Sequence, residues 1–285
     1  MTRSSLKWIW TLCLVAAGVL IIALPSPEGR PSPEIGLWLA AALFGIAFLG
    51  EYVDSTLGMG YGTTLTPLLL VMGFSPLQVV PAVLLSELFS GLFAGVLHHK
   101  MGNVDLGKGS PARRLALTLA LCSILGVTGA VFLALNLPPQ TVKIYIGIMV
   151  LGIGVLLLLG KGMASRWSPS HILGLGVVAA FNKGISGGGY GPLLTGGQML
   201  SGVPEKTAIG VTSLAEGLVC IVGLSVYLLL HGWPNWELAA CLTLGAVLSV
   251  PAAAITVKIL PAFLLRRSVG YATVFLGAVT LIKLV

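Results

Sequence analysis

The chain has 285 residues, of which 56% are hydrophobic and only 9% are charged. Soluble domains carry roughly 25% charged residues, so water cannot be the main solvent of this chain. The net charge of +7 does not indicate nucleic acid either, because the basic residues are spread over short loops and form no patch or arm. We therefore expect an integral membrane protein whose main surroundings are the lipid bilayer.

Apolar runs separated by proline and glycine follow one another along the whole chain. A run of about 20 residues can cross a hydrocarbon core of roughly 30 Å as a helix. The expected helical segments are residues 8–24, 35–57, 63–73, 76–97, 113–135, 141–160, 171–186, 192–202, 204–230, 236–257 and 267–285. The sequence thus predicts an all-α polytopic membrane protein. The first run follows a basic start and would also fit a signal peptide, but we interpret it as an extra N-terminal transmembrane helix.

Two glycine-rich stretches, residues 54–63 and 181–192, have related sequences. Residues 58–87 can be laid on residues 187–216 without a gap, which matches nine positions in thirty. The matched pairs are Gly58/Gly187, Gly60/Gly189, Tyr61/Tyr190, Gly62/Gly191, Leu65/Leu194, Thr66/Thr195, Gly73/Gly202, Leu85/Leu214 and Glu87/Glu216. This similarity predicts an internal repeat. We expect a helix and loop over 1–34, a first repeat over 35–165 and a second over 166–285.

The segments 63–73 and 192–202 have only 11 residues each and would reach about half the thickness of the core. They predict broken-helix hairpins whose glycine-rich tips lie near the midplane. The basic loops 98–114 and 161–170 fall on one side if the N-terminus is cytoplasmic, which predicts a multi-pass protein of the cell inner membrane. The same count makes the two repeats inverted. It cannot distinguish hairpins from segments that cross fully twice.

The glycine-rich tips suggest an anion site. Glycine lets backbone N–H groups approach a ligand, and each helix N-terminus carries the equivalent of about +0.5 charge. Thr63 and Thr64 stand at a cap position in one copy and Pro192 at a first helical position in the other. The candidate substrate-binding residues are Gly58, Gly60, Tyr61, Gly62 and Thr63, with Lys183, Ser186, Gly187, Gly188, Gly189 and Tyr190. The alternative is that the glycines serve only close packing.

Charged residues inside apolar runs are costly and are functional candidates. Glu87 and Glu216 lie near the middle of equivalent segments and could bind and release protons. Equally, protonated glutamates could hold the hairpin backbone by hydrogen bonds. Asp54 occupies the position that Lys183 holds in the other copy, and an ion pair between them would weaken Lys183 as an anion ligand.

Composition offers no metal, cofactor or catalytic signature. The four cysteines each stand alone in an apolar run, and the four histidines fall in loops or at helix ends, where solvated and interface roles are expected. The stretch GISG around Ser186 fits the GxSG pattern of rhomboid intramembrane serine proteases, but these need a histidine at membrane depth as base. An intramembrane serine hydrolase is therefore the weaker alternative, and we expect no enzyme.

The stretches GMGYGTTLTPLLLVMG (58–73) and SGGGYGPLLTGGQMLSG (186–202) resemble the signature of the TauE/SafE sulfite exporter family, also called the toluene sulfonate uptake permease family. The resemblance covers nearly the whole chain after about residue 35. The motif carries over the glycines at 58, 60, 62, 187, 188, 189 and 191 and the prolines at 67 and 192. Tyr61 and Tyr190 stand where glycine is commoner, and the prolines follow their glycines at different spacings.

The resemblance implies a bacterial inner-membrane carrier of sulfite, sulfoacetate or another small organosulfonate. We expect secondary transport by alternating access, with export as the direction that needs no coupling ion. The alternative is proton-coupled uptake of a small organic anion, for which Glu87 and Glu216 are the candidate proton carriers. A channel would differ from either by showing no saturation. The sequence leaves a homodimer open.

Overall fold

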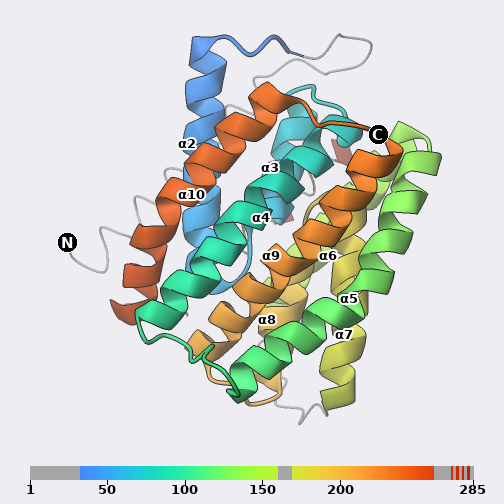
Figure 1. The fold of residues 1–285 in the computed structure, drawn as a ribbon. Helices are drawn as coiled ribbons and strands as arrows, with labels where there is room; N and C mark the ends of the chain where they lie inside the picture. Colours follow the sequence, from blue (N-terminus) through green and yellow to red (C-terminus); the bar gives the residue numbers. More distant parts are fainter. Residues whose placement is uncertain are drawn as a thin grey trace.

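In the computed structural model the described residues, 33–159, 169–259 and a few positions between 271 and 282, are all helical or in loops. Figure 1 shows how the helices are arranged. They are α2 (Leu37–Leu57), α3 (Tyr61–Val71), α4 (Pro76–Lys100), α5 (Pro111–Asn136), α6 (Pro139–Leu159), α7 (Pro169–Ser186), α8 (Tyr190–Leu200), α9 (Glu205–Leu230) and α10 (Trp236–Ile259). The expected helix over 8–24 lies outside the described residues, as does most of the segment 267–285.

Within the described part, five helices are long and apolar enough to cross a membrane, namely α2, α4, α5, α9 and α10. Large apolar side chains stand exposed on them, such as Leu125 at 82% and Leu121 at 68%. A surface of this kind is unfavourable in water and is expected in contact with lipid. The prediction of an all-α polytopic membrane protein is confirmed for these residues.

Proline and serine set the starts of two long helices. The Ser75 side chain and Gln78 form a capping box in front of α4, and Pro76 is the first helical residue. The Ser110 side chain accepts a hydrogen bond from the Arg113 amide in front of α5, where Pro111 comes first. Both devices satisfy or remove amide groups that lack a partner in the first turn of a helix. The loops before these helices therefore end at defined residues.

The helices α3 and α8 have 11 residues each, as expected for half-helices, but both begin two residues earlier than the sequence suggested. The N-cap residues are Gly60 and Gly189, whose positive φ angles end the preceding turn and let the helix start at once. The expectation that Thr63 and Thr64 cap α3 and that Pro192 opens α8 is therefore wrong. Thr63 and Pro192 are each the third residue of the helix.

Helix packing follows the same plan in the sets α2–α5 and α7–α10. The helix α2 packs on α10 and α7 packs on α5, while α4 packs on α9. A Cβ atom on Gly245 of α10 would lie 2.3 Å from the Phe44 carbonyl oxygen, and one on Gly126 of α5 would lie 2.3 Å from that of Val177. In Figure 1, α2 enters from the top and α7 from the bottom. The first helix of each set is thus held by the last helix of the other.

Two apolar clusters flank the place where the glycine-rich segments meet. One gathers buried side chains of α2, α3, α4, α6 and α10, and the other those of α4, α5, α7, α8 and α9. Tyr61 at the start of α3 belongs to the first cluster and Tyr190 at the start of α8 to the second. Each half-helix is therefore anchored in its own core, with its N-terminal end at the centre of the molecule.

Candidate functional site

Two tight glycine turns end the helices α2 and α7. Gly58 and Gly187 have φ angles of 69° and 72°, a left-handed conformation that side chains disfavour. The Gly58 amide donates to the Asp54 carbonyl oxygen at 2.6 Å, and the Gly187 amide donates to that of Lys183 at 2.8 Å. We call residues 58–60 the first turn and residues 187–189 the second turn. The first residues of the two turns have the same conformation, whereas the third residues, Gly60 and Gly189, have φ angles of 132° and 83°.

Each turn packs through glycine against the start of the half-helix that follows the other turn, and we call this the contact between the turns. A Cβ atom on Gly62 would lie 1.9 Å from the Gly187 carbonyl oxygen, and one on Gly191 would lie 2.4 Å from that of Gly58. Either approach is too close for any side chain, so glycine is required there by packing. The N-terminal ends of α3 and α8 are thereby brought together. The glycines of the motif have conformational and packing reasons that need no ligand.

The hydroxyl groups proposed as substrate donors are paired with protein groups. The hydroxyls of Tyr61 and Ser86 lie 2.6 Å apart, and those of Tyr190 and Ser123 lie 3.3 Å apart. The Ser186 hydroxyl donates to the Asn182 carbonyl oxygen at 2.7 Å and accepts from the Gly188 amide at 3.1 Å. Since neither partner of Ser186 is a base, the geometry offers no activation of Ser186 as a nucleophile.

Lys183 lies at the centre of the site. Its side chain is completely buried, and its ammonium group donates hydrogen bonds to Glu87 Oε2 and, at 2.7 Å, to Glu216 Oε1. These contacts join α7 to α4 and α9. The glutamates therefore hold a lysine rather than the hairpin backbone, because a buried ammonium needs acceptors that carry negative charge.

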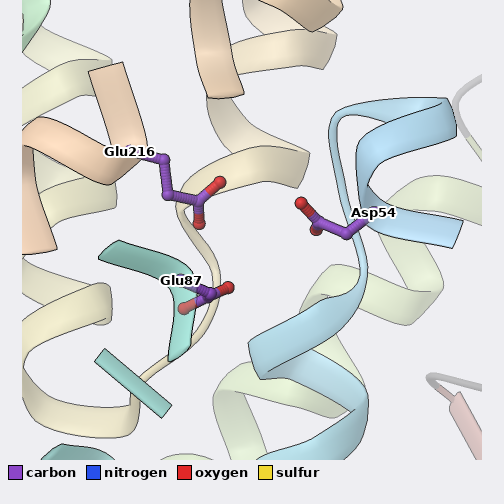
Figure 2. Close-up of side chains that lie close together, drawn as sticks. All are labelled: Asp54, Glu87 and Glu216. Carbon is purple, nitrogen blue, oxygen red and sulfur yellow. The ribbon is translucent and has the colours of Figure 1, made fainter. Parts of the chain in front are cut away.

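Asp54 completes a group of three carboxylates. Figure 2 shows Asp54 of α2, Glu87 of α4 and Glu216 of α9 pointing toward one another. Each contributes an oxygen atom, and these atoms lie within 4.8 Å of one another. Asp54 Oδ1 accepts a hydrogen bond from the Tyr61 amide at 3.0 Å, so Asp54 caps α3, whereas the ion pairs of Lys183 are with the two glutamates. Carboxylate oxygens suit a hard cation, and an ammonium already holds two of the three groups.

A fourth buried carboxylate stands near this group. Glu51 precedes Asp54 by three positions on α2, which places it on the same side of the helix. It accepts a hydrogen bond from the Ser55 hydroxyl at 2.6 Å. Among the described residues, Glu51 Oε2 and Glu87 Oε1 are buried without a hydrogen-bond partner. The side chains of this region thus carry more potential negative charge than Lys183 can balance.

Two further hydrogen bonds tie the broken helix ends to the long helices, and sequence reasoning missed both. His98 Nε2 lies 2.9 Å from the Ser55 carbonyl oxygen, and the Tyr227 hydroxyl donates to that of Gly184 at 3.0 Å. Both bonds satisfy carbonyl groups that the last turn of a helix leaves unpaired. Ser55/Gly184 and His98/Tyr227 are each 129 positions apart, the offset of the repeat, and this offset could have revealed them.

His98 differs from the expectation of a solvated or interface histidine. Its side chain is buried, and its Nδ1 atom lies 3.0 Å from Asn103 Nδ2, which also donates to the Ala254 carbonyl oxygen. Because the Ser55 carbonyl can only accept, Nε2 must carry the hydrogen. The imidazole therefore links α2, α4, the following loop and α10.

A small apolar pocket of about 20 Å³ lies beside the second turn. Its walls come from the start of α4, the end of α5 and the start of α6, together with Ile185 and Tyr227. The lining offers no charged group to an anion. The pocket is therefore a less suitable anion site than the region around Lys183.

Comparison with known proteins gives one family. The family model described as "Sulfite exporter TauE/SafE" matches residues 42–280. The chain is 30% identical over 254 residues to the "Probable membrane transporter protein YtnM" of Bacillus subtilis (strain 168), covering 84% of this chain and 81% of that protein. No solved structure matches it. The chain therefore belongs to the TauE/SafE sulfite exporter family of membrane transporters.

Proposed function

We propose that this protein is a secondary carrier of a small sulfur-containing anion, namely sulfite, sulfoacetate or a related C2 organosulfonate, working by alternating access. The observation that carries the proposal is the buried ammonium of Lys183 close to the place where the N-terminal ends of two half-helices meet. Helix N-termini and an ammonium group favour an anion together, since both present positive charge. The substrate would contact residues of the segments 58–63 and 183–190.

We also propose the membrane arrangement that the sequence suggested, with inverted repeats over 35–165 and 166–285 and a cytoplasmic N-terminus in the bacterial inner membrane. The matching helix pairs α2/α10 and α7/α5 support the repeat. The basic loop 98–114 supports the orientation, because loops rich in lysine and arginine stay in the cytoplasm. The turns would then lie between the two membrane faces, where carriers bind their substrates.

The contacts of Lys183 favour proton coupling. Glu87 and Glu216 already accept from two of the three N–H groups of Lys183, so an anion that pairs with Lys183 either adds a negative charge beside two carboxylates or displaces one of them. Both outcomes are strongly unfavourable in a buried site. Two charges 4 Å apart interact by about 4 kcal/mol even at an effective dielectric constant of 20. We infer that one of the two glutamates takes up a proton as the anion binds. This favours proton-coupled transport over the uncoupled export that the membrane potential alone would drive.

The test is flux in liposomes with the purified full-length protein. Sulfite, sulfoacetate, taurine, sulfate and thiosulfate are presented in turn, with current recorded on a supported membrane and internal pH followed by a dye. We expect saturable transport of sulfite or a sulfonate accompanied by acidification of the compartment that receives the anion. A saturable current without proton movement would support uncoupled export instead. No transport of any of these anions would contradict the proposed substrate class.

Three variants assign the site in this assay. Lys183→Ala should abolish flux, whereas Lys206→Ala should keep it, because Lys206 lies exposed at the start of α9. Ser186→Ala should keep most of the flux, since the Ser186 hydroxyl contacts only backbone groups. Complete loss of activity in Ser186→Ala, with normal elution and melting of the protein, would favour the hydrolase alternative.

A further inference from the structure

The two glycine turns begin with the same backbone conformation, at Gly58 and Gly187, but they differ in chemistry. At the first turn Asp54 Oδ1 accepts a hydrogen bond from the Tyr61 amide, the first N–H of α3. At the second turn Lys183 holds the equivalent position, and an ammonium cannot accept. Within the described residues no acceptor is paired with the Tyr190 or Gly191 amide, the first two N–H groups of α8. The positive end of α3 is neutralised by a carboxylate, and that of α8 is not.

The equivalent residues Thr66 and Thr195 also differ in whether their polar groups are paired. Thr195 of α8 faces the first turn, and its hydroxyl donates to the Gly58 carbonyl oxygen at 2.7 Å. Thr66 is its counterpart on α3 and faces the second turn, where a Cβ atom on Gly187 would lie 3.2 Å from the Thr66 hydroxyl. The Thr66 side chain is completely buried, and its hydroxyl has no hydrogen-bond partner in the described part of the chain. A buried hydroxyl left unpaired is uncommon and costly, so it calls for an explanation.

We propose that the anion binds at the second turn alone, held by the amides of Tyr190 and Gly191, the hydroxyl of Thr66 and the ammonium of Lys183. The ligand class is a small oxyanion, sulfite or a sulfonate, whose three oxygens can accept from these separate donors. Asp54 occupies the equivalent place at the first turn as a carboxylate fixed to the chain. This assignment rests on the proposed function, and it reduces two equivalent tips to one binding site.

The contact between the turns also keeps the proposed anion donors away from solvent. Tyr190 is completely buried, and the second turn lies against Gly62 and Thr63 of α3. The donors become accessible only when the two turns separate. Anion binding is therefore tied to a change of structure, which a carrier requires and a permanently open pore does not.

The threonine pair supplies the test and its matched control. Thr66→Val and Thr195→Val remove equivalent hydroxyls at nearly constant volume. Binding of sulfite and sulfoacetate to the purified full-length protein is measured by calorimetry, and melting temperature is measured alongside. Thr66→Val should weaken anion binding about tenfold, the effect of one hydrogen bond to a charged group. Thr195→Val should bind the anion like the wild type and melt earlier, because the Gly58 carbonyl loses its hydrogen bond and Thr212 keeps the one from Gln198 but loses the one from Thr195.

Asp54→Asn gives a second, independent measurement. The asparagine side chain can still accept from the Tyr61 amide, but its negative charge is gone, so anion binding should become tighter. Unchanged affinity in Thr66→Val, or an equal loss in Thr195→Val, would overturn the assignment to the second turn while leaving the carrier intact. Weaker binding in Asp54→Asn would overturn the role of Asp54 as a competing carboxylate. A wild type that binds none of these anions would overturn the proposed function itself.

Discussion

At the scale of single residues, the charged groups were found from the sequence and their partners were not. Glu87, Glu216 and Lys183 stand out because a charge inside an apolar run is costly and needs a reason. Lys183 is 96 positions from Glu87 and 33 from Glu216, and no periodicity joins positions so far apart. The sequence therefore indicated these charges as candidates, and only the fold shows that they are paired with one another.

The two glutamates should determine how transport depends on protons. Glu87→Gln and Glu216→Gln each remove one acceptor charge from Lys183 and one group that can take a proton. We expect either variant to lose accumulation driven by a pH gradient, while exchange of anion for anion at equal pH persists. Both activities can be measured with labelled sulfite in liposomes.

Glu205→Gln is the control for these variants, because Glu205 is exposed at the start of α9. It should accumulate the anion like the wild type. Gradient-driven accumulation that is unchanged in both glutamine variants would contradict proton coupling through this pair.

At the scale of elements, the half-helices were predictable in length and less so in position. Their 11-residue length follows from the spacing of glycines and prolines, which the sequence displays directly. Their starts at Tyr61 and Tyr190 depend on positive φ angles at Gly60 and Gly189. Glycine adopts positive and negative φ angles almost equally well, so the residue type does not predict these angles. The contact between the turns was missed for a related reason. A glycine required by a distant backbone atom has the same appearance in sequence as one required by a local turn.

Gly62 gives a direct test of the contact between the turns. An added methyl group in Gly62→Ala would meet the backbone of Gly187, which cannot move aside as a flexible side chain could. We expect the free energy of unfolding to fall by about 1–3 kcal/mol, the usual effect of overpacking. Gly45→Ala on α2 is the matched control, because no atom lies within 4 Å of the added carbon. Equal unfolding curves for both variants would contradict a tight contact.

At the scale of the whole molecule, the helix pairs α2/α10 and α7/α5 each join a helix of residues 35–165 to one of residues 166–285. Composition and hydropathy predicted a bundle of membrane helices, but they carry no information on which helices pack together. The repeat carried part of that information, since equivalent helices make equivalent contacts. The glycines at 126 and 245, which allow the closest approaches, could be recognised only once their partners were known.

This interlocked packing predicts that neither repeat is stable alone. Residues 1–165 and 166–285, produced as separate chains, should each be degraded or aggregate, because α2 and α7 lose the helices that cover them. Produced together, they should associate and restore transport of the anion. The comparison needs only a membrane blot and the liposome assay. Accumulation of a monodisperse, folded single repeat would contradict the prediction.

The hydrogen bonds of His98 and Tyr227 have a consequence for the speed of the cycle. Both hold the end of a broken helix. In the described part of the chain the Tyr227 hydroxyl makes this one bond, whereas His98 is joined through Asn103 to a loop and to α10. Breaking the Tyr227 bond frees the end of α7 alone, whereas breaking the His98 bond also disturbs the loop after α4 and its contact with α10. The activation barriers for opening toward the two membrane faces should then be unequal. Such a carrier would run faster in one direction under equal driving force at saturating anion, although the final distribution would still be set by the gradients alone.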